Sequence, residues 1–313
     1  MSTAATNAIE WGVWLDAPAK INLFLHVIGR RPDGYHLLQT AFRFLDFGDR
    51  LRFTPRADGA LRRVNPLEGV AEEDDLCMRA ARLLQSETGC TQGVDIELDK
   101  HLPMGGGLGG GSSDAATVLI ALNRLWRLDL SRASLQALAL RLGADVPVFV
   151  FGRSAFAEGV GERLQAVALP AAAYVVVAPG VSVPTPLVFA APELTRNTEP
   201  CKIADFAEVA AQQRLFGRND LQPVAAQNFA AVAHAIRLLG EEVGEQEVRM
   251  SGSGACVFAQ CATRGQAEKV LATLSARWPE GWQGFVACGV DVHPLHGEMS
   301  GDGQGSKNDA VQL

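Results

Sequence analysis

The sequence predicts an α+β protein built from two domains. Its 313 residues suit two domains of ordinary size, and 48% of them are hydrophobic, which is enough for a packed core in each. In the second half the predicted elements follow the order β, α, β, β, α, β, which is typical of a ferredoxin-like domain. We place the domains at residues 1–163 and 164–296, and we predict that the polar, glycine-rich residues 297–313 form a disordered tail.

The first domain is predicted to open with a strand. Residues 19–28 alternate between apolar side chains on one face and a second face that carries Lys20 and Asn22. A Pro-Asp-Gly turn at residues 32–34 follows, and then a mostly apolar segment over residues 35–47. The alternation therefore places Lys20 and Asn22 side by side.

Helical and strand patterns continue through the first domain. Ala115 to Trp126 show helical spacing, and Ser112 and Ser113 are the caps available at the start of that helix. Asp145 lies in a short connection before an apolar run, which we interpret as a strand. The remaining predictions are helices at 76–84 and 131–142, the second ending at Gly143, a strand at 94–98, and the apolar run at 146–151.

The second domain is predicted to contain four strands and three helices, with a proline-rich connection after the first strand. The strands are expected at 174–178, 248–251, 255–259 and 285–292, and the helices near 203–213, 223–239 and 265–275.

Composition narrows the function classes. A formal net charge of −7 and a pI near 5.4 provide no basic surface for nucleic acid or for anionic lipid. The N-terminus lacks the pattern of a signal peptide, and no apolar run is long enough to span a bilayer, so we expect a cytoplasmic protein with a small-molecule partner, as a monomer or homodimer. The six cysteines show neither zinc-ligand nor disulfide spacing, and we expect ordinary core residues.

A glycine-rich segment is the strongest chemical signal. Six of the nine residues from Pro103 to Gly111 are glycine, which allows backbone N–H groups to converge on one anion at the start of a helix. A flexible linker is the alternative, but a strand precedes the segment and an amphipathic helix follows it. We therefore predict a site for ATP phosphates formed by Pro103, Met104, Gly105, Gly106, Gly107, Leu108, Gly109, Gly110, Gly111, Ser112 and Ser113.

The segment lacks the Gly-Lys-Ser/Thr ending of a P-loop, so a lysine from elsewhere must reach the terminal phosphates. Lys20 is the candidate, although a single strand lysine is more often solvated. Asp145 is a candidate base for phosphoryl transfer, and on its own it is equally well an ordinary loop aspartate or a capping aspartate. The Ser251–Gly254 segment favours a tight hairpin, with packing against the glycine loop as the alternative.

Four segments together resemble the galactokinase, homoserine kinase, mevalonate kinase and phosphomevalonate kinase (GHMP) superfamily. They are Ala-Pro-Ala-Lys-Ile-Asn-Leu-Phe-Leu at 17–25 with Arg-Pro-Asp-Gly-Tyr-His at 31–36, the glycine segment at 102–116, Leu-Gly-Ala-Asp-Val-Pro-Val-Phe at 142–149, and Ser-Gly-Ser-Gly-Ala-Cys at 251–256. The resemblance implies a two-domain fold, with an N-terminal domain like ribosomal protein S5 domain 2 and a ferredoxin-like C-terminal domain.

The resemblance also implies an activity and site residues. The activity is ATP-dependent phosphorylation, with Mg²⁺, of the 2-hydroxyl of 4-diphosphocytidyl-2-C-methyl-D-erythritol in the non-mevalonate route to isoprenoid precursors. Asp145 would accept the hydroxyl proton and Lys20 would orient the hydroxyl. Tyr35, His36 and Phe189 would hold the cytosine, Asn22 and Thr185 would lie near the substrate, and Gly252, Ser253 and Gly254 would support the site.

Two other functions are compatible with the same fold. One is a kinase of the same superfamily for mevalonate, homoserine or a sugar, which would not need the Tyr35-His36 pair. The other is a nucleotide-binding regulator without activity, which would not need Asp145 as a base.

Overall fold

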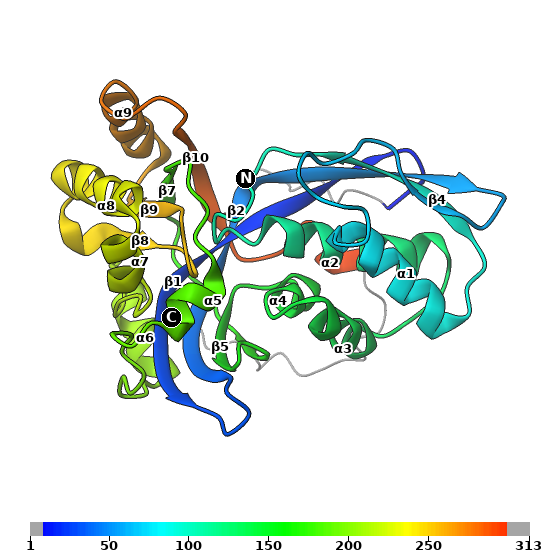
Figure 1. The fold of residues 1–313 in the computed structure, drawn as a ribbon, viewed down its shortest axis with the longest axis horizontal. Helices are drawn as coiled ribbons and strands as arrows, with labels where there is room; N and C mark the ends of the chain where they lie inside the picture. Colours follow the sequence, from blue (N-terminus) through cyan, green and yellow to red (C-terminus); the bar gives the residue numbers. More distant parts are fainter. Residues whose placement is uncertain (1–8, 299–313) are drawn as a thin grey trace.

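The computed structural model describes residues 9–298. It shows two groups of elements joined through one continuous sheet (Figure 1). Along this sheet the strands follow the order β3-β4-β2-β10-β7-β9-β8, and β1, β5 and β6 branch from it at β2. The strands are β1 (Trp14–Arg30), β2 (His36–Arg56), β3 (Leu61–Arg63), β4 (Gly93–Asp99), β5 (Ala155–Gly159), β6 (Arg163–Ala166), β7 (Ala173–Ala178), β8 (Val248–Met250), β9 (Val257–Cys261) and β10 (Gln283–Val290).

The first group is organised around the long antiparallel pair β1 and β2. Their pairing shifts register between Pro18 and Lys20 and again between Asn22 and Leu25. Such irregularities bend a strand and redirect its side chains. The predicted strand at 19–28 is confirmed, and the two shifts flank the Lys20 to Asn22 segment.

Four helices lie together on one side of β1, β2 and β4 in Figure 1, and α2 contacts both β1 and β2. They are α1 (Leu76–Thr88), α2 (Gly110–Leu125), α3 (Arg132–Leu142) and α4 (Val146–Phe151). Helix α2 is nearly enclosed, with all of residues 113–123 buried, and it is the centre of the first core. The predicted bounds of α3 are confirmed to within one residue: Ser131, predicted as its first residue, is its N-cap, and the helix ends before Gly143 as predicted.

The second group confirms the ferredoxin-like prediction. Strands β10, β7, β9 and β8 are neighbours in that order and pair antiparallel. Helices α7, α8 and α9 pack against one face of these strands, α6 packs against the opposite face, and α5 lies between the two groups in Figure 1. The helices are α5 (Thr185–Ala190), α6 (Ile203–Ala211), α7 (Gln222–Asn228), α8 (Ala230–Val243) and α9 (Arg264–Ser275), with short 3₁₀ turns at Glu245–Glu247 and His296–Glu298.

Four local predictions were wrong. The single helix predicted near 223–239 is two helices, α7 and α8, separated by Phe229 in an extended conformation. The run Val146–Phe151 is helix α4 rather than a strand; it is buried almost throughout, so its pattern has no polar face to reveal the period, and a proline occupies its first turn. Helix α2 begins at Gly110 with Gly109 as its cap, so Ser112 and Ser113 lie inside the first turn and do not cap it. The proline-rich connection after β7 contains the unpredicted helix α5.

The segment after β10 returns to the first group. The side chain of Leu295 is fully buried in the first core, and the ring of His293 lies edge-on to Phe44 at 5.9 Å. No helix within residues 9–298 combines the length and apolar character needed to cross a membrane. The predicted tail at 297–313 lies almost entirely outside the described residues.

Candidate active site

Lys20 is a buried lysine in the middle of the molecule. Its side chain is 1% exposed, which contradicts the solvated alternative, and its Nζ atom lies 2.9 Å from Oδ2 of Asp145. Nζ also donates a hydrogen bond of 2.7 Å to Oδ1 of Asn22 and lies 5.3 Å from the centre of the Phe42 ring. Because an ammonium group carries three N–H donors, these two contacts leave one donor for a ligand.

Asp145 reaches this lysine from the start of α4. It occupies the N-cap position, but its side chain makes no capping hydrogen bond. With 39% of the side chain exposed, the carboxylate borders the cavity, whereas its partner lysine is enclosed. The capping alternative is therefore contradicted, and the structure brings together the two residues proposed for catalysis.

Asn22 is held from both sides. Its Nδ2 donates to Oγ1 of Thr40 over 2.9 Å, and Thr40 in turn donates to the carbonyl of Phe24 over 2.5 Å. Because these two hydrogen bonds orient the amide group of Asn22, its oxygen faces Lys20. Thr40 is paired with Leu25 beyond the register shift, and Asn22 is paired with Phe42, so sequence reasoning missed the side-chain contact between Thr40 and Asn22.

The glycine segment forms a loop that passes directly over Lys20. Gly109 has φ of 71°, and a Cβ atom there would lie 3.0 Å from Cγ and Cε of Lys20. Only glycine allows both the left-handed conformation and this approach. The Leu108 carbonyl accepts from the backbone N–H of Lys20 at 2.9 Å, so the loop is attached to β1 beside the catalytic candidates.

The Ser251–Gly254 turn packs against the glycine loop and is hydrogen-bonded to it. Ser251 Oγ donates to the carbonyl of Gly107 at 2.8 Å, and the N–H of Cys256 donates to the carbonyl of Gly106 at 3.0 Å. A Cβ atom on Gly107, where φ is 75°, would lie 2.1 Å from the Ser251 carbonyl. The segment thus belongs to a hairpin connection between paired strands β8 and β9, which is longer than the tight turn predicted because β8 ends at Met250 and β9 begins at Val257, and it also packs against the glycine loop.

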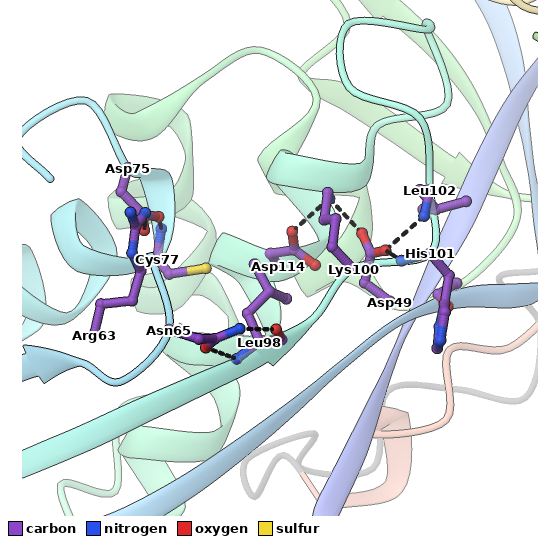
Figure 2. Close-up of polar contacts among 11 residues, drawn as sticks. Asp49, Arg63, Asn65, Asp75, Cys77, Leu98, Lys100, His101, Leu102 and Asp114 are labelled. Carbon is purple, nitrogen blue, oxygen red and sulfur yellow. Dashed lines mark hydrogen bonds and ion pairs between the residues drawn. The ribbon is translucent and has the colours of Figure 1, made fainter. Parts of the chain in front are cut away.

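A second charged cluster fixes both ends of the loop (Figure 2). Lys100 Nζ donates to Asp49 at 2.5 Å and to Asp114 at 2.9 Å. The other Asp49 oxygen accepts the backbone N–H groups of His101 and Leu102 at 2.7 and 2.8 Å. Because Lys100 precedes the loop and Asp114 follows it, the cluster sets the distance between the loop's two ends. Sequence reasoning missed this cluster.

The two carboxylates of this cluster share one ammonium group in a buried place. Asp49 and Asp114 are at most 2% exposed, and Oδ1 of Asp114 has no hydrogen-bond partner among the described residues. Burial raises the pKa of Asp114 to about 7; the charge of Lys100 opposes this rise and that of Asp49 adds to it. The folded protein therefore retains the Asp114 proton at pH values where the unfolded chain has lost it.

This difference predicts a pH-dependent effect of Asp114→Asn on stability. Since the folded pKa is raised above the ordinary value of 3.8, wild-type stability from this group falls as pH rises from about 4 to about 7. The slope approaches one proton, about 1.4 kcal/mol per pH unit, and asparagine removes it. Urea denaturation of both proteins at half-unit steps from pH 4.5 to 8.5 would measure the difference, and a constant offset between them would contradict the assignment.

Three adjoining cavities form one cleft along these residues. The first, of about 410 Å³, is lined by the glycine loop, Lys100, Asp114 and Asp145. The second, of about 270 Å³, contains Lys20, Asn22 and Asp145, and the third, of about 940 Å³, contains Tyr35, His36 and Phe189. Asp145 lines the first two cavities and Thr185 lines all three, so the Lys20–Asp145 pair lies between the glycine loop and a pocket with aromatic walls.

The aromatic pocket is partly preorganised. The rings of His36 and Phe189 stack with centres 4.9 Å apart and planes at 26°, while Tyr35 is 66% exposed at the rim. Thr185, in the first turn of α5, shares a hydrogen bond of 2.7 Å with Ser253 of the supporting turn. The residues predicted from the sequence therefore border this cleft or belong to the Ser251–Gly254 turn, except Ser113, which is fully buried in α2 and lines none of the three cavities.

Comparisons with known proteins agree with this geometry. The family model described as "GHMP kinases N terminal domain" matches residues 75–153, and that described as "GHMP kinases C terminal" matches residues 195–280. The fold of a homoserine kinase from Cytophaga hutchinsonii is similar, with a TM-score of 0.64 at 17% identity, covering 91% of this chain and 96% of that one. The chain belongs to the GHMP kinase family.

Nearer relatives define its place within that family. Proteins of Aromatoleum aromaticum and Thiobacillus denitrificans, both named 4-diphosphocytidyl-2-C-methyl-D-erythritol kinase, are 59% and 58% identical to it. The alignments cover 90% of this chain and 94% and 96% of the relatives. A crystal structure of 4-(cytidine 5'-diphospho)-2C-methyl-D-erythritol kinase has a TM-score of 0.76 at 37% identity, covering 88% of this chain and 99% of that one. Within the GHMP kinases, the chain groups with these enzymes.

Proposed function

We propose that this kinase transfers the γ-phosphoryl group of ATP to the 2-hydroxyl of 4-diphosphocytidyl-2-C-methyl-D-erythritol, giving the 2-phosphate and ADP. The observation that carries the proposal is the Lys20–Asp145 pair, 2.9 Å apart, where the phosphate-loop cavity meets the substrate cavity. The names of the relatives at 55–59% identity support the choice of acceptor. The third cavity, with stacked rings in its wall, suits a flat base attached to that acceptor.

The pair suggests how the reaction proceeds. The substrate hydroxyl oxygen attacks the γ-phosphorus, the bond from that phosphorus to the β–γ bridging oxygen breaks, and the hydroxyl proton passes to a carboxylate oxygen of Asp145. The remaining N–H donor of Lys20 faces the oxygen atoms on which negative charge increases. Asn22, oriented by Thr40, holds the ammonium group in place for this contact.

ATP would lie along the first cavity. The loop from Gly105 to Gly109 and the start of α2, at Gly110 to Ser112, offer backbone N–H groups to its phosphates, whereas the Ser113 N–H already donates to the Gly109 carbonyl at 2.7 Å. Apolar side chains of the 61–76 region, Leu67, Val70 and Leu76, line the same cavity and suit the adenine ring.

Mg²⁺ would accompany the nucleotide. Residues 9–298 contain no group of three or more His, Cys, Asp or Glu residues that could hold a metal ion alone. This fits Mg²⁺, which enzymes of this kind usually bind through substrate phosphates, water and one or two carboxylates. Phosphate oxygens would thus provide most of its ligands, and the ion would offset phosphate charge.

A coupled ADP-release assay tests the proposal. With Mg-ATP, we expect turnover of 4-diphosphocytidyl-2-C-methyl-D-erythritol and only background rates with mevalonate, homoserine or galactose. Turnover of one of those three in its place would move the chain to another branch of the family. ATP binding without turnover of any acceptor would favour the inactive regulator.

A further inference from the structure

Arg196 is a charged residue that contacts the wall of the aromatic pocket and takes no part in the proposed phosphoryl transfer. It follows α5, and its guanidinium group donates to three backbone carbonyls: those of Phe189 at 2.9 Å, Ala191 at 2.7 Å and Leu194 at 3.1 Å. Its fourth hydrogen bond runs from Nε to Nε2 of His36 over 3.2 Å. The same group thus holds both stacked residues of the pocket wall, Phe189 through its backbone and His36 through its ring.

The hydrogen bond to His36 determines where the imidazole carries its proton. An arginine side chain has only N–H donors and stays charged, so Nε2 of His36 must accept. The ring is then neutral with its proton on Nδ1, because a proton on Nε2 would face the Arg196 N–H. Partial burial, and the positive charges of Arg196 and of Arg30 at the end of β1, lower the pKa of His36, which agrees with a neutral ring.

The Nδ1–H group is the free end of this ring. Among the described residues it has no hydrogen-bond partner, and His36 lines the third cavity, which Arg196 does not. A ligand in that cavity therefore meets a fixed donor. Cytosine presents an acceptor at N3, whereas uracil presents a donor, N3–H, at the same position.

We propose that Arg196 is a positioning residue that sets base specificity by fixing His36 as an Nδ1–H donor, which pairs with cytosine and rejects uracil. The inference rests on the proposed function, since it assumes that the third cavity holds the base of the acceptor. Without Arg196, the imidazole could shift its proton to Nε2 and accept from uracil N3–H. Discrimination between the two bases should then decrease.

The test compares kcat/KM for the cytidyl substrate and its uridyl counterpart in Arg196→Met. At pH 8 we expect their ratio to fall roughly tenfold or more, mainly through KM for the cytidyl substrate, while kcat changes little. Arg214→Met is the control, because Arg214 is exposed and lies after α6. An unchanged ratio in Arg196→Met would overturn the inference and leave the proposed function intact, whereas a wild type inactive on the cytidyl substrate would overturn the proposed function itself.

Two further measurements distinguish an effect of Arg196 on the His36 imidazole from a general loss of structure. Protonation restores the Nδ1–H donor, so the ratio in Arg196→Met should recover as pH falls toward 5.5, while the wild-type ratio stays flat. In a His36→Ala background, Arg196→Met should change the ratio no further. A ratio that stays low at every pH, or an equal loss in that background, would show that Arg196 acts through α5 alone and would overturn the proposal.

Discussion

Replacing Asp145 with asparagine should lower turnover by on the order of a hundredfold or more and leave ATP binding nearly unchanged. Asparagine has the same shape, and its oxygen can still accept from Lys20 at the present distance of 2.9 Å. It cannot take the hydroxyl proton, so the loss should fall on the chemical step. Steady-state kinetics with Mg-ATP, together with calorimetric titration of ATP, would separate these two effects.

The matched control is Asp205→Asn, the same exchange at an exposed side chain that caps α6 by accepting from the Lys202 N–H at 3.2 Å. It should change turnover less than twofold. If Asp145→Asn kept near-normal turnover, Asp145 would not be the base. If it lost ATP binding in proportion to turnover, the carboxylate would act in holding the nucleotide.

Local signals in the sequence predicted much of the fold because some boundaries depend on neighbouring residues alone. Ser131 and Gly143 bound α3 as expected, since a serine cap and a terminal glycine act within one turn. The order β10-β7-β9-β8 likewise followed from the predicted sequence of elements. The errors arose where contacts between distant segments determine the secondary structure. Helix α4 is an example, because neighbouring elements bury it almost throughout and its sequence therefore has no polar face.

The site shows the same division. Alternation along β1 predicted that Lys20 lies beside Asn22. The burial of Lys20 and its ion pair with Asp145 depend on the glycine loop, β2 and α4, which are distant in the sequence. The motifs identified residues that face the cleft directly. Arg196 and Lys100 were missed because each acts through partners far away in the chain, 160 residues for Arg196 and His36. No local pattern reports such contacts.

Replacing Lys20 with methionine should lower turnover by about a hundredfold to a thousandfold, the scale of losing one preorganised charge at the reacting group. Methionine nearly fills the space of the lysine stem, which matters because Gly109 and Phe42 pack closely around it. The affinity for ATP should change by only a few fold, because in the proposed binding mode the loop backbone makes most of the phosphate contacts. Lys269→Met, at an exposed position on α9, is the matched control.

Combining this exchange with Asp145→Asn tests whether the two residues act as one unit. If Lys20 holds the hydroxyl while Asp145 removes its proton, each single variant already disables the step, and the double variant should be little slower than the worse single one. Additive losses would mean that the two side chains contribute independently, although they lie 2.9 Å apart.

A Lys20→Met protein with intact turnover and weakened ATP binding would instead show that Lys20 acts mainly in binding the nucleotide. Thermal unfolding of all three variants distinguishes these outcomes from misfolding, since Asp145→Asn leaves the buried Lys20 ammonium group without its carboxylate partner.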